Sequence, residues 1–376
     1  MSLQAYVGAN IFDGMALHQG FALLLDAGAF HGVCEARSVP EGAEKIMLAG
    51  GTILPGFVDL QVNGGGGVMF NDDQSVTALA IIARAHARTG TAAILPTLIT
   101  DTPARTRAAI AAVAQAIAQN VPGIIGLHLE GPHLDIARKG AHDPSLIRPM
   151  AAEDFALICG AARQLPNLML TVAPKSVTPA QIAGLRAAGV IVSLGHSDCS
   201  YETALTCFDA GARCATHLFN AMSQLGNREP GLVGAVLDSG GVSCGLIADG
   251  IHVHPASIRA ALGAKRGPGR VFLVTDAMST LGSEITEFQL NGRRVLRQNG
   301  RLTLENGSLA GADLEMPGAI SVMVNKVGVT LSQALAMATV YPANVLRQPG
   351  EYGRFVTGYP SHAIHLGASL KTRALT

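Results

Sequence analysis

The sequence predicts an α/β protein: a (β/α)8, TIM-like barrel that carries a small β-sandwich built from both ends of the chain. Three observations support this fold class. From Pro55-Gly56 onward, short apolar runs alternate with stretches of helical period. Before that point, and again in the tail from residue 353, the chain has strand-like runs instead. Of the 376 residues, 48% are hydrophobic and only 14% are charged, which suits a large, well-covered core.

The barrel is predicted from eight apolar runs, because eight strands alternating with helices are what a closed parallel barrel requires. The predicted strands are residues 57–61, 92–97, 124–130, 168–173, 190–195, 214–217, 242–248 and 271–276. The predicted helices are residues 75–88, 103–119, 152–163, 178–188, 202–210 and 255–262, and Pro103 is a good helix start. Residues 218–241 are rich in glycine and turn residues and lack a clear helix, so we expect a functional loop there.

The two ends of the chain are predicted to form one discontinuous domain. Strand candidates before the barrel are residues 21–25, 33–37, 45–48 and 52–54, and the tail has strand character at 362–366. We therefore expect a β-sandwich domain of residues 1–55 with 350–376, and a barrel domain of residues 56–349. After residue 276 comes an apparent insertion of short strands, 288–290, 293–296 and 300–304, with turns at Asn291-Gly292 and Asn299-Gly300. Helices return at residues 316–327 and 331–338.

Charge and cysteine content narrow the class of protein. The 27 basic and 27 acidic residues balance, so no overall field attracts nucleic acid or a membrane surface, and an anionic substrate must be held by local groups. The six cysteines are scattered without a C-x-x-C motif, which is typical of free thiols in a reducing compartment. With no signal-like N-terminus, the sequence predicts a soluble, cytoplasmic protein.

Polar side chains recur where the predicted barrel strands end, and this is the face at which such barrels carry their chemistry. Glu130 ends a buried strand that Gly131-Pro132 stops, and an acid there is costly to bury without a cation or hydrogen bonds. His196 and His217 end the fifth and sixth strands. One carboxylate and two imidazoles form a common ligand set for a catalytic divalent metal, most often zinc, which lowers the pKa of a bound water toward ~7. Asp276, at the end of the eighth strand, suits a general base beside that metal.

A single histidine at a strand end is more often structural, but three candidate ligands and an aspartate at equivalent positions favour a metal site. Other polar residues after the strands are candidates for the substrate. Arg228 has a forked set of donors that matches phosphate, although an isolated arginine is more often a surface charge. His142 could polarise a substrate carbonyl or merely cap its loop, and its sequence context leaves both open. Further candidates for holding an anion are Asn220, Ala221, Asn227 and His252.

Several of these motifs, taken in order, resemble the N-acetylglucosamine-6-phosphate deacetylase family of the amidohydrolase superfamily. The resemblance runs from about residue 50 to residue 345. The motifs that carry it are Leu54-Pro55-Gly56-Phe57-Val58-Asp59, His128-Leu129-Glu130-Gly131-Pro132, Gly195-His196-Ser197, Thr216-His217-Leu218-Phe219-Asn220-Ala221-Met222, Arg228-Glu229-Pro230-Gly231, Ile247-Ala248-Asp249-Gly250-Ile251-His252 and Thr275-Asp276-Ala277.

The resemblance implies a role for each candidate residue. It implies a metal held by Glu130, His196 and His217, and Asp276 as base toward the water and then acid toward the leaving amine. It implies that His142 contacts the acetamido carbonyl. It also implies substrate contacts by Asn220, the backbone of Ala221, His252 and the segment beginning at Leu309, and a homodimer in which Arg228 reaches the phosphate of the neighbouring subunit's substrate.

The sequence departs from the superfamily or family pattern at four places, one of which is Ser361-His362-Ala363 in the tail, where an Ala-Asp pair is usual. Many amidohydrolases have His-x-His at the end of the first strand for a second metal, whereas this chain has Gln61-Val62-Asn63. Because an amide is a poorer zinc ligand than imidazole, we predict one divalent metal per subunit, with zinc favoured and iron or cobalt possible on the same ligands. Lys175 stands where the family usually has glutamate, and His133 where it often has an aromatic residue.

The resemblance implies hydrolysis of the acetamide of N-acetyl-D-glucosamine 6-phosphate to D-glucosamine 6-phosphate and acetate, as in amino-sugar catabolism. Deacetylation of the galactosamine epimer is the nearest alternative, because no partner of the sugar 4-hydroxyl can be identified from the sequence. Two more distant alternatives are another amidohydrolase activity, such as cyclic-amide hydrolysis or deamination, and a non-catalytic sugar-phosphate sensor.

Overall fold

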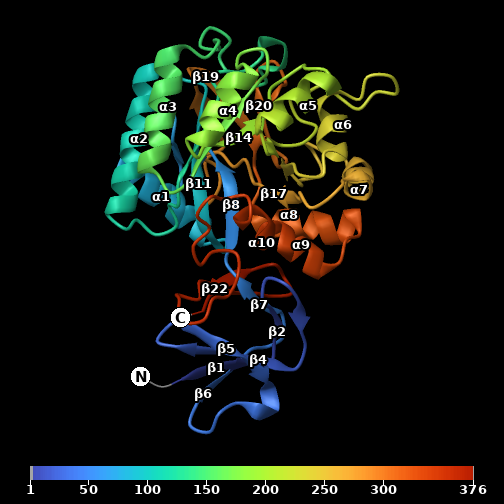
Figure 1. The fold of residues 1–376 in the computed structure, drawn as a ribbon. Helices are drawn as coiled ribbons and strands as arrows, with labels where there is room; N and C mark the ends of the chain where they lie inside the picture. The colour runs from blue at the N-terminus through green and yellow to red at the C-terminus, as the bar shows by residue number, and fades with distance from the viewer. Residues whose placement is uncertain (1–2, 376) are drawn as a thin grey trace.

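The structure is a computed structural model that describes residues 3–375. Its centre is a sheet of eight parallel strands in the order β17-β16-β15-β14-β13-β12-β11-β8. The two edges of this sheet meet, because Val62 bridges Ala277 in parallel and the Asp276 amide donates to Gln61 O at 3.0 Å. The barrel is thus closed, as predicted. Its carboxyl end faces away from the two small sheets that contain the ends of the chain (Figure 1). The strands are β8 (Phe57–Val62), β11 (Thr91–Ile99), β12 (Leu127–Glu130), β13 (Leu168–Val172), β14 (Ile191–Leu194), β15 (Cys214–Ala215), β16 (Ser243–Leu246) and β17 (Val271–Leu273).

Helices cover the outside of the barrel and bury one face each against the strands. The six predicted helices are all present, with ends shifted by at most a few residues. Thr102, which precedes Pro103, accepts a hydrogen bond from the Arg105 amide at 3.3 Å and so caps its helix as the sequence indicates. The helices are α1 (Val76–Ala87), α2 (Pro103–Ala118), α3 (Ala152–Gln164), α4 (Pro179–Ala187), α5 (Tyr201–Ala210) and α7 (Pro255–Ala264). None of the helices in residues 3–375 is long and apolar enough to cross a membrane.

The prediction of a loop without helix at residues 218–241 is wrong in its second half. Residues Gly231–Asp238 form helix α6. Every residue from Gly231 to Leu237 is buried, so the helix has no polar face and no helical period in its sequence. Its two glycines also lower its helix propensity, and packing against the barrel overrides that preference. The first half, residues 218–230, does lack helix.

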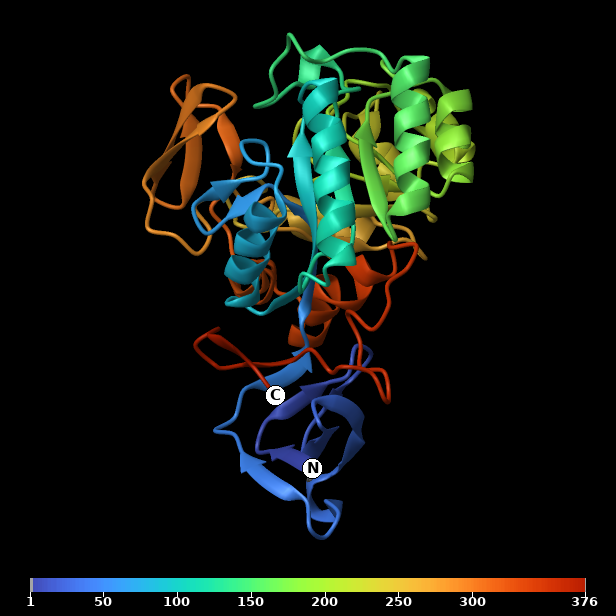
Figure 2. The same cartoon turned by 90° about the vertical axis from the view of Figure 1, so that its left-hand side faces the viewer.

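Strands from both ends of the chain pair in two small sheets below the barrel (Figures 1 and 2). One has the order β5-β4-β1-β6, and the other β23-β22-β7-β2-β3, in which β22 from the tail runs antiparallel to β7. Their inner faces share an aliphatic cluster that includes Ile11, Leu23 and Ile53. The division of the chain into domains at residues 55/56 and 349/350 stays a prediction. The strands are β1 (Gln4–Val7), β2 (Asn10–Phe12), β3 (Leu17–His18), β4 (Phe21–Asp26), β5 (Ala29–Glu35), β6 (Glu44–Met47), β7 (Thr52–Pro55), β22 (Ala363–Leu366) and β23 (Thr372–Ala374).

A four-stranded antiparallel sheet follows the last barrel strand, and we call it the insertion sheet. It comprises β18 (Glu287–Leu290), β19 (Arg293–Gln298), β20 (Arg301–Leu304) and β21 (Leu309–Ala312), the last of which the sequence did not reveal. Asn291 and Gly292 have φ of +49° and +73°, so the predicted two-residue turn is confirmed. The sheet stands beside the barrel in its upper half (orange in Figure 2).

The remaining elements are short. Met316–Val322 forms α8, and a π-helical stretch continues it over Met323–Val327, so the helix predicted at 316–327 changes its hydrogen-bonding pattern midway. Helices α9 (Leu331–Ala338) and α10 (Val340–Ala343) follow. The others are β9 (Gly64–Gly65), β10 (Val68–Met69) and the 3-10 turns Ala36–Ser38 and Ile136–Arg138.

Candidate active site

Glu130, His196 and His217 come together at the carboxyl end of the barrel. Glu130 Oε1 lies 3.0 Å from both His196 Nε2 and His217 Nε2, and the two Nε2 atoms lie 3.1 Å apart. We call these three atoms the ligand triangle. All three side chains are buried. Residues far apart in the chain meet here because Glu130, His196 and His217 lie at the carboxyl ends of β12, β14 and β15 in one closed parallel sheet.

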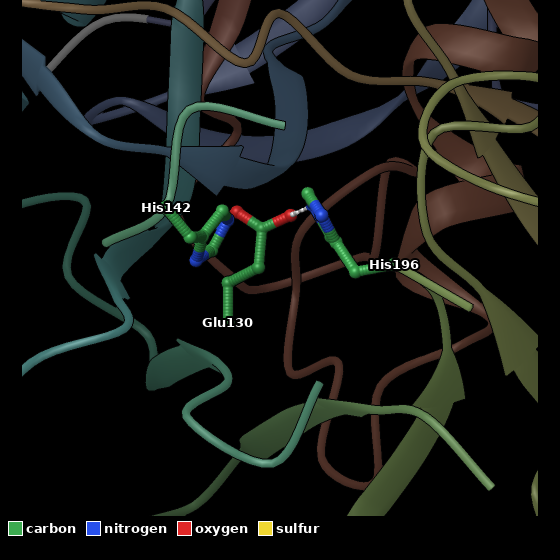
Figure 3. Close-up of side chains that lie close together, drawn as sticks. All are labelled: Glu130, His142 and His196. Carbon is green, nitrogen blue, oxygen red and sulfur yellow. Dashed lines mark hydrogen bonds and ion pairs between the residues drawn. The ribbon is translucent and has the colours of Figure 1, made fainter. Parts of the chain in front are cut away.

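The ligand triangle fits a divalent cation. His196 Nδ1 lies 2.8 Å from Arg138 O, which can only accept, so Nδ1 carries the proton and the neutral ring presents a lone pair at Nε2. A carboxylate oxygen and an imidazole lone pair, facing a second imidazole at about 3 Å, need a positive charge between them. Ligand atoms of Glu130, His142 and His196 also lie within 4.8 Å of one another, and Figure 3 shows Glu130 between the imidazoles of His142 and His196.

Asp276 lies beside the ligand triangle and is held by two amides. Its Oδ1 accepts from Gln61 Nε2 at 3.1 Å and from Asn63 Nδ2 at 2.6 Å. The same Gln61 nitrogen donates to both oxygens of Glu130, at 3.3 and 3.2 Å. Gln61 thus bridges two buried carboxylates that would otherwise repel each other. With their NH2 groups turned toward the carboxylates, both amides present donors rather than lone pairs to the site.

The surroundings lower the pKa of Glu130 and raise the pKa of Asp276. Burial alone would raise the pKa of Glu130, but the neighbouring imidazoles of His196 and His217 hold it well below its usual value. Burial raises the pKa of Asp276 to about 6, and the neighbouring charge of Glu130 adds to this effect. A carboxyl group that binds and releases protons near neutral pH suits proton transfer.

His142 presents a donor to the pocket. The Thr100 amide donates to His142 Nδ1 at 3.4 Å, and Thr100 Oγ1 lies 2.7 Å from the same atom. An Nδ1 that accepts leaves the proton of the neutral ring on Nε2. Burial lowers the pKa of His142 well below its usual value, so the ring stays neutral. The sequence left a choice between polarising a carbonyl and capping a loop, and the free Nε2–H favours the first.

Backbone strain concentrates at this site. His196, His217, Phe219, Ala221 and Asp276 all have positive φ, between +31° and +76°, although none is glycine. Such conformations cost of order 1–3 kcal/mol each and persist only where the surroundings hold them. Left-handed residues two or three positions after β14, β15 and β17 turn the chain sharply at these strand ends. The strain supports a functional role for this end of the molecule.

Most of the predicted substrate residues line one pocket with the ligand triangle. His142, Asp276, Asn220, Ala221, His252 and Leu309 all face it. His252 is fixed by Asp249, whose Oδ2 lies 2.6 Å from its Nδ1. Arg228 is exposed on the loop before α6 and is not among the residues that line this pocket.

Sequence reasoning missed the residues that support or enclose the site. Gln61 was treated only as a replaced ligand, and nothing indicated that Thr100 orients His142. The apolar lining residues Ile99, Met278 and Leu290 were also missed, because apolar residues next to polar motifs carry no signal of their own. The departures at His133 and Lys175 lie outside the pocket. His133 Nδ1 is 3.1 Å from Arg148 O, and the exposed Lys175 pairs with Asp135 at 3.3 Å.

Comparison with known proteins agrees with this fold. Residues 52–368 match the model of the amidohydrolase family. The chain is 44% identical over 344 residues to N-acetylgalactosamine-6-phosphate deacetylase of Shewanella sp. (strain ANA-3), covering 91% of this chain and 86% of that protein. It is 34% identical over 345 residues to N-acetylglucosamine-6-phosphate deacetylase of Haemophilus influenzae, covering 91% and 89%. The chain belongs to the amidohydrolase family, as the motifs predicted.

Solved structures place it further within that family. The crystal structure of N-acetylglucosamine-6-phosphate deacetylase from Pasteurella multocida superposes with a TM-score of 0.93 at 34% identity, covering 98% of this chain and 97% of that one. A mutant of the Mycobacterium smegmatis deacetylase, in complex with N-acetyl-D-glucosamine-6-phosphate, superposes with a TM-score of 0.90 at 28% identity, covering 99% and 97%. The similarity therefore includes the two small sheets as well as the barrel.

Proposed function

We propose that this chain is a metal-dependent deacetylase that hydrolyses the acetamide of N-acetyl-D-glucosamine 6-phosphate to D-glucosamine 6-phosphate and acetate, a step in amino-sugar catabolism. One observation carries the proposal. A buried carboxyl group with a raised pKa, Asp276, shares a pocket with the ligand triangle and with the Nε2–H donor of His142. These are the groups that amide hydrolysis needs, and the relatives with this fold are deacetylases of acetamido sugar phosphates.

Glu130, His196 and His217 would hold one divalent metal, zinc by preference, with iron or cobalt able to use the same ligands. Such a metal lowers the pKa of water and polarises a carbonyl oxygen. Gln61 and Asn63 support the single-metal proposal, because both direct NH2 groups rather than lone pairs toward Asp276.

Two side chains would then move or hold protons during the reaction. Asp276 takes a proton from the water that attacks the acetamide carbon, and it gives that proton to the sugar nitrogen as the carbon–nitrogen bond breaks. His142 donates its Nε2–H to the carbonyl oxygen, where negative charge develops. The water thereby divides between the two products, with its oxygen in acetate and a proton on the amine. Gln61 keeps Asp276 beside Glu130 throughout.

The sugar phosphate would lie across the remaining side of the pocket. Asn220, the backbone of Ala221 and His252 are the polar groups that line this side, and Leu309 closes it from the insertion sheet. We propose that Arg228 completes the phosphate site of the neighbouring subunit in a homodimer, which accords with its exposed position outside its own pocket. The six free cysteines support a cytoplasmic location.

The galactosamine epimer is a second candidate substrate. It is favoured by the 44% identity to an N-acetylgalactosamine-6-phosphate deacetylase, which exceeds the 34% identity to the Haemophilus enzyme that acts on the glucosamine epimer. Both substrates present the same acetamide and the same phosphate, so the groups described above serve either one.

Acetate release from both epimers, with metal measured on the same sample, tests the proposal. We expect turnover of at least one N-acetylhexosamine 6-phosphate, and the ratio of the two kcat/KM values assigns the epimer. One equivalent of metal per chain is expected, and two equivalents in carefully purified protein would reject the single-metal proposal. Activity on unphosphorylated ureides instead would indicate another amidohydrolase, and binding without acetate release would indicate a sensor.

A further inference from the structure

The tip of the insertion sheet touches the loop that carries His142. Strands β18 and β19 are joined by the two-residue turn Asn291-Gly292, and Leu290 pairs directly with Arg293 across it. Paired residues project from the same face of a hairpin. Leu290 is buried and lines the active-site pocket, and the Arg293 guanidinium donates a hydrogen bond to Ala141 O.

Apolar packing reinforces this contact. Ala141 packs against a buried cluster in which Leu290 and Val295 of the insertion sheet meet Ile99 and Met278 of the barrel. The loop is thus held at Ala141 in two ways, through its carbonyl by Arg293 and through its methyl group by the cluster. Arg293 is half-buried and makes no ion pair within 4.0 Å in the described chain, so its hydrogen bond to Ala141 is its evident role.

The loop held in this way, residues 138–142, carries His142 and also holds the ring of His196, a candidate metal ligand. Arg138 O accepts from His196 Nδ1 at 2.8 Å and so fixes the ring of one metal-ligand candidate. His142 lies at the other end, and its amide donates to Lys139 O at 3.0 Å to close a turn. Gly140 lies between them, with φ of +56°, close enough to His196 that an added Cβ would be 3.3 Å from Cε1. Movement of Ala141 would therefore shift His142.

We propose that Arg293 is a positioning residue of the active site: it clamps Ala141 O and so holds the His142 Nε2–H at the place where the substrate carbonyl lies. This inference rests on the proposed function for its kinetic consequence, but the clamp itself is a property of the folded chain. It assigns the insertion sheet a part in catalysis beyond enclosing the pocket, because the hairpin tip supplies both a wall residue and the clamp.

A matched control lies next along the same strand. Arg294 points to the opposite face of β19 and pairs with Glu287 in solvent, with both side chains about half exposed, at 49% and 52%. Arg293→Met and Arg294→Met remove the same guanidinium from neighbouring positions while keeping a long apolar stem. Only the first should affect the loop. Arg293→Lys, which keeps a donor without the planar fork, should retain part of the effect.

The first measurement is hydrogen exchange of the backbone amides in peptides covering residues 138–143. Loss of the clamp should speed exchange there roughly 10-fold in Arg293→Met, because the turn closed by the His142 amide opens more often. Arg294→Met should match the wild type, and Arg293→Lys should fall between. Unchanged exchange in Arg293→Met would overturn the clamp, whether or not the chain proves to be a deacetylase.

The second measurement is a double-mutant cycle with His142→Asn, which keeps an acceptor for the Thr100 amide but removes Nε2–H. We expect Arg293→Met to lower kcat about 10-fold with KM within about twofold of wild type, since misplacement of a catalytic group affects the transition state. In the His142→Asn background, Arg293→Met should cost less than about twofold further. An equal loss in both backgrounds would mean that Arg293 does not act through His142.

The two measurements separate failure of the clamp from failure of the proposed function. If the wild-type protein releases no acetate from either epimer, the proposed function is wrong, and the exchange experiment alone decides on the clamp. If the wild type is active, the clamp must satisfy both measurements. A melting temperature for each variant shows whether a kinetic loss reflects unfolding.

Discussion

The active-site pocket has two walls of different construction. One, the strand-end wall, consists of polar residues at the ends of barrel strands: Asn63, Glu130, His196, His217 and Asp276. Gln61 supports this wall through its hydrogen bonds to Glu130 and Asp276. The other, the apolar wall, comes from a strand end, a loop and the insertion sheet: Ile99, Ala141, Met278, Leu290 and Leu309. The first is fixed by backbone ladders of the barrel. In the second, Ile99, Met278 and Leu290 belong to one hydrophobic cluster, and Ala141 packs against it.

The difference shows how the two walls depend on each other. Burial is the largest cause of the raised pKa of Asp276, so exclusion of water from the pocket is part of what sets its proton affinity. The strand-end wall, in turn, carries the backbone strain at His196, His217 and Asp276. Changes to the strand-end wall should therefore remove chemistry, and changes outside it should alter binding, positioning or stability.

The largest effect should come from the strand-end wall. Asp276→Asn keeps the size of the side chain but cannot take a proton, so we expect kcat to fall about 10³-fold or more. Metal content should stay at the wild-type level, because Asp276 is not part of the ligand triangle. Acetate release and elemental analysis on the same preparation measure both. Asp73→Asn, at an exposed position, controls for the substitution itself.

Near-wild-type turnover in Asp276→Asn would remove Asp276 from the mechanism. Loss of metal together with activity would instead make Asp276 a ligand, and the strand-end wall would then hold its cation with four side chains rather than three.

A smaller effect is expected from Arg228, which belongs to neither wall. If it contacts the phosphate of the neighbouring subunit's substrate, Arg228→Met should lower kcat/KM about 10- to 100-fold, mostly through KM. The location is tested by mixing this variant with Asp276→Asn and allowing subunits to exchange. A mixed dimer then has one intact site of its two, with Asp276 from one subunit and Arg228 from the other. Because random exchange of equal amounts makes about half of the dimers mixed, activity should recover to about a quarter of wild type.

No recovery on mixing, with exchange of subunits verified by differently tagged chains, would show that Arg228 serves its own subunit or none. Matched mixing of Arg294→Met with Asp276→Asn provides the reference, because Arg294 lies far from this loop in sequence and pairs with Glu287 in solvent.

The two walls also differ in how far the sequence predicts them. Glu130, His196, His217 and Asp276 could be expected to meet, because the ends of neighbouring parallel strands share one edge and closure of the barrel brings the first and last strands together. The structure brings these side chains together, while their roles as ligands and base stay predictions. The alternating pattern likewise predicted the eight strands and the covering helices.

The apolar wall could not be predicted in this way. The turn at Asn291-Gly292 specified a hairpin, but the direction in which its tip points depends on packing between Leu290, Ile99 and Met278, which are far apart in sequence. Helix α6 was missed for a related reason, since a helix buried on all sides has no periodic pattern to read. Gln61 was judged by what it replaces, and only distances show that it bridges Glu130 and Asp276.

The smallest effect concerns the support beneath the strand-end wall. Asp59 is fully buried and accepts hydrogen bonds from the amides of Gln61 and Thr275 and from the Thr275 hydroxyl, so it ties β8 to the residue before Asp276. Burial raises its pKa to about 7 from 3.8, and the charge of Asp276 adds to this. Between these two pH values the folded protein binds a proton that the unfolded chain has released. Folding stability from this group is therefore lost as pH rises toward and through 7.

Asp59→Asn removes this titration, so the expected result is a change in how the free energy of unfolding varies with pH. Since one pKa unit corresponds to about 1.4 kcal/mol, the wild type should lose about 1.4 kcal/mol of unfolding free energy from Asp59 between pH 6 and pH 8. The variant should lack that loss, although its absolute stability falls because an amide NH2 faces the Gln61 and Thr275 donors. Denaturant unfolding at both pH values measures it, with the exposed Asp26→Asn as control. A variant that kept the wild-type slope would mean that Asp59 stays charged in the folded protein, and that its hydrogen bonds outweigh its burial.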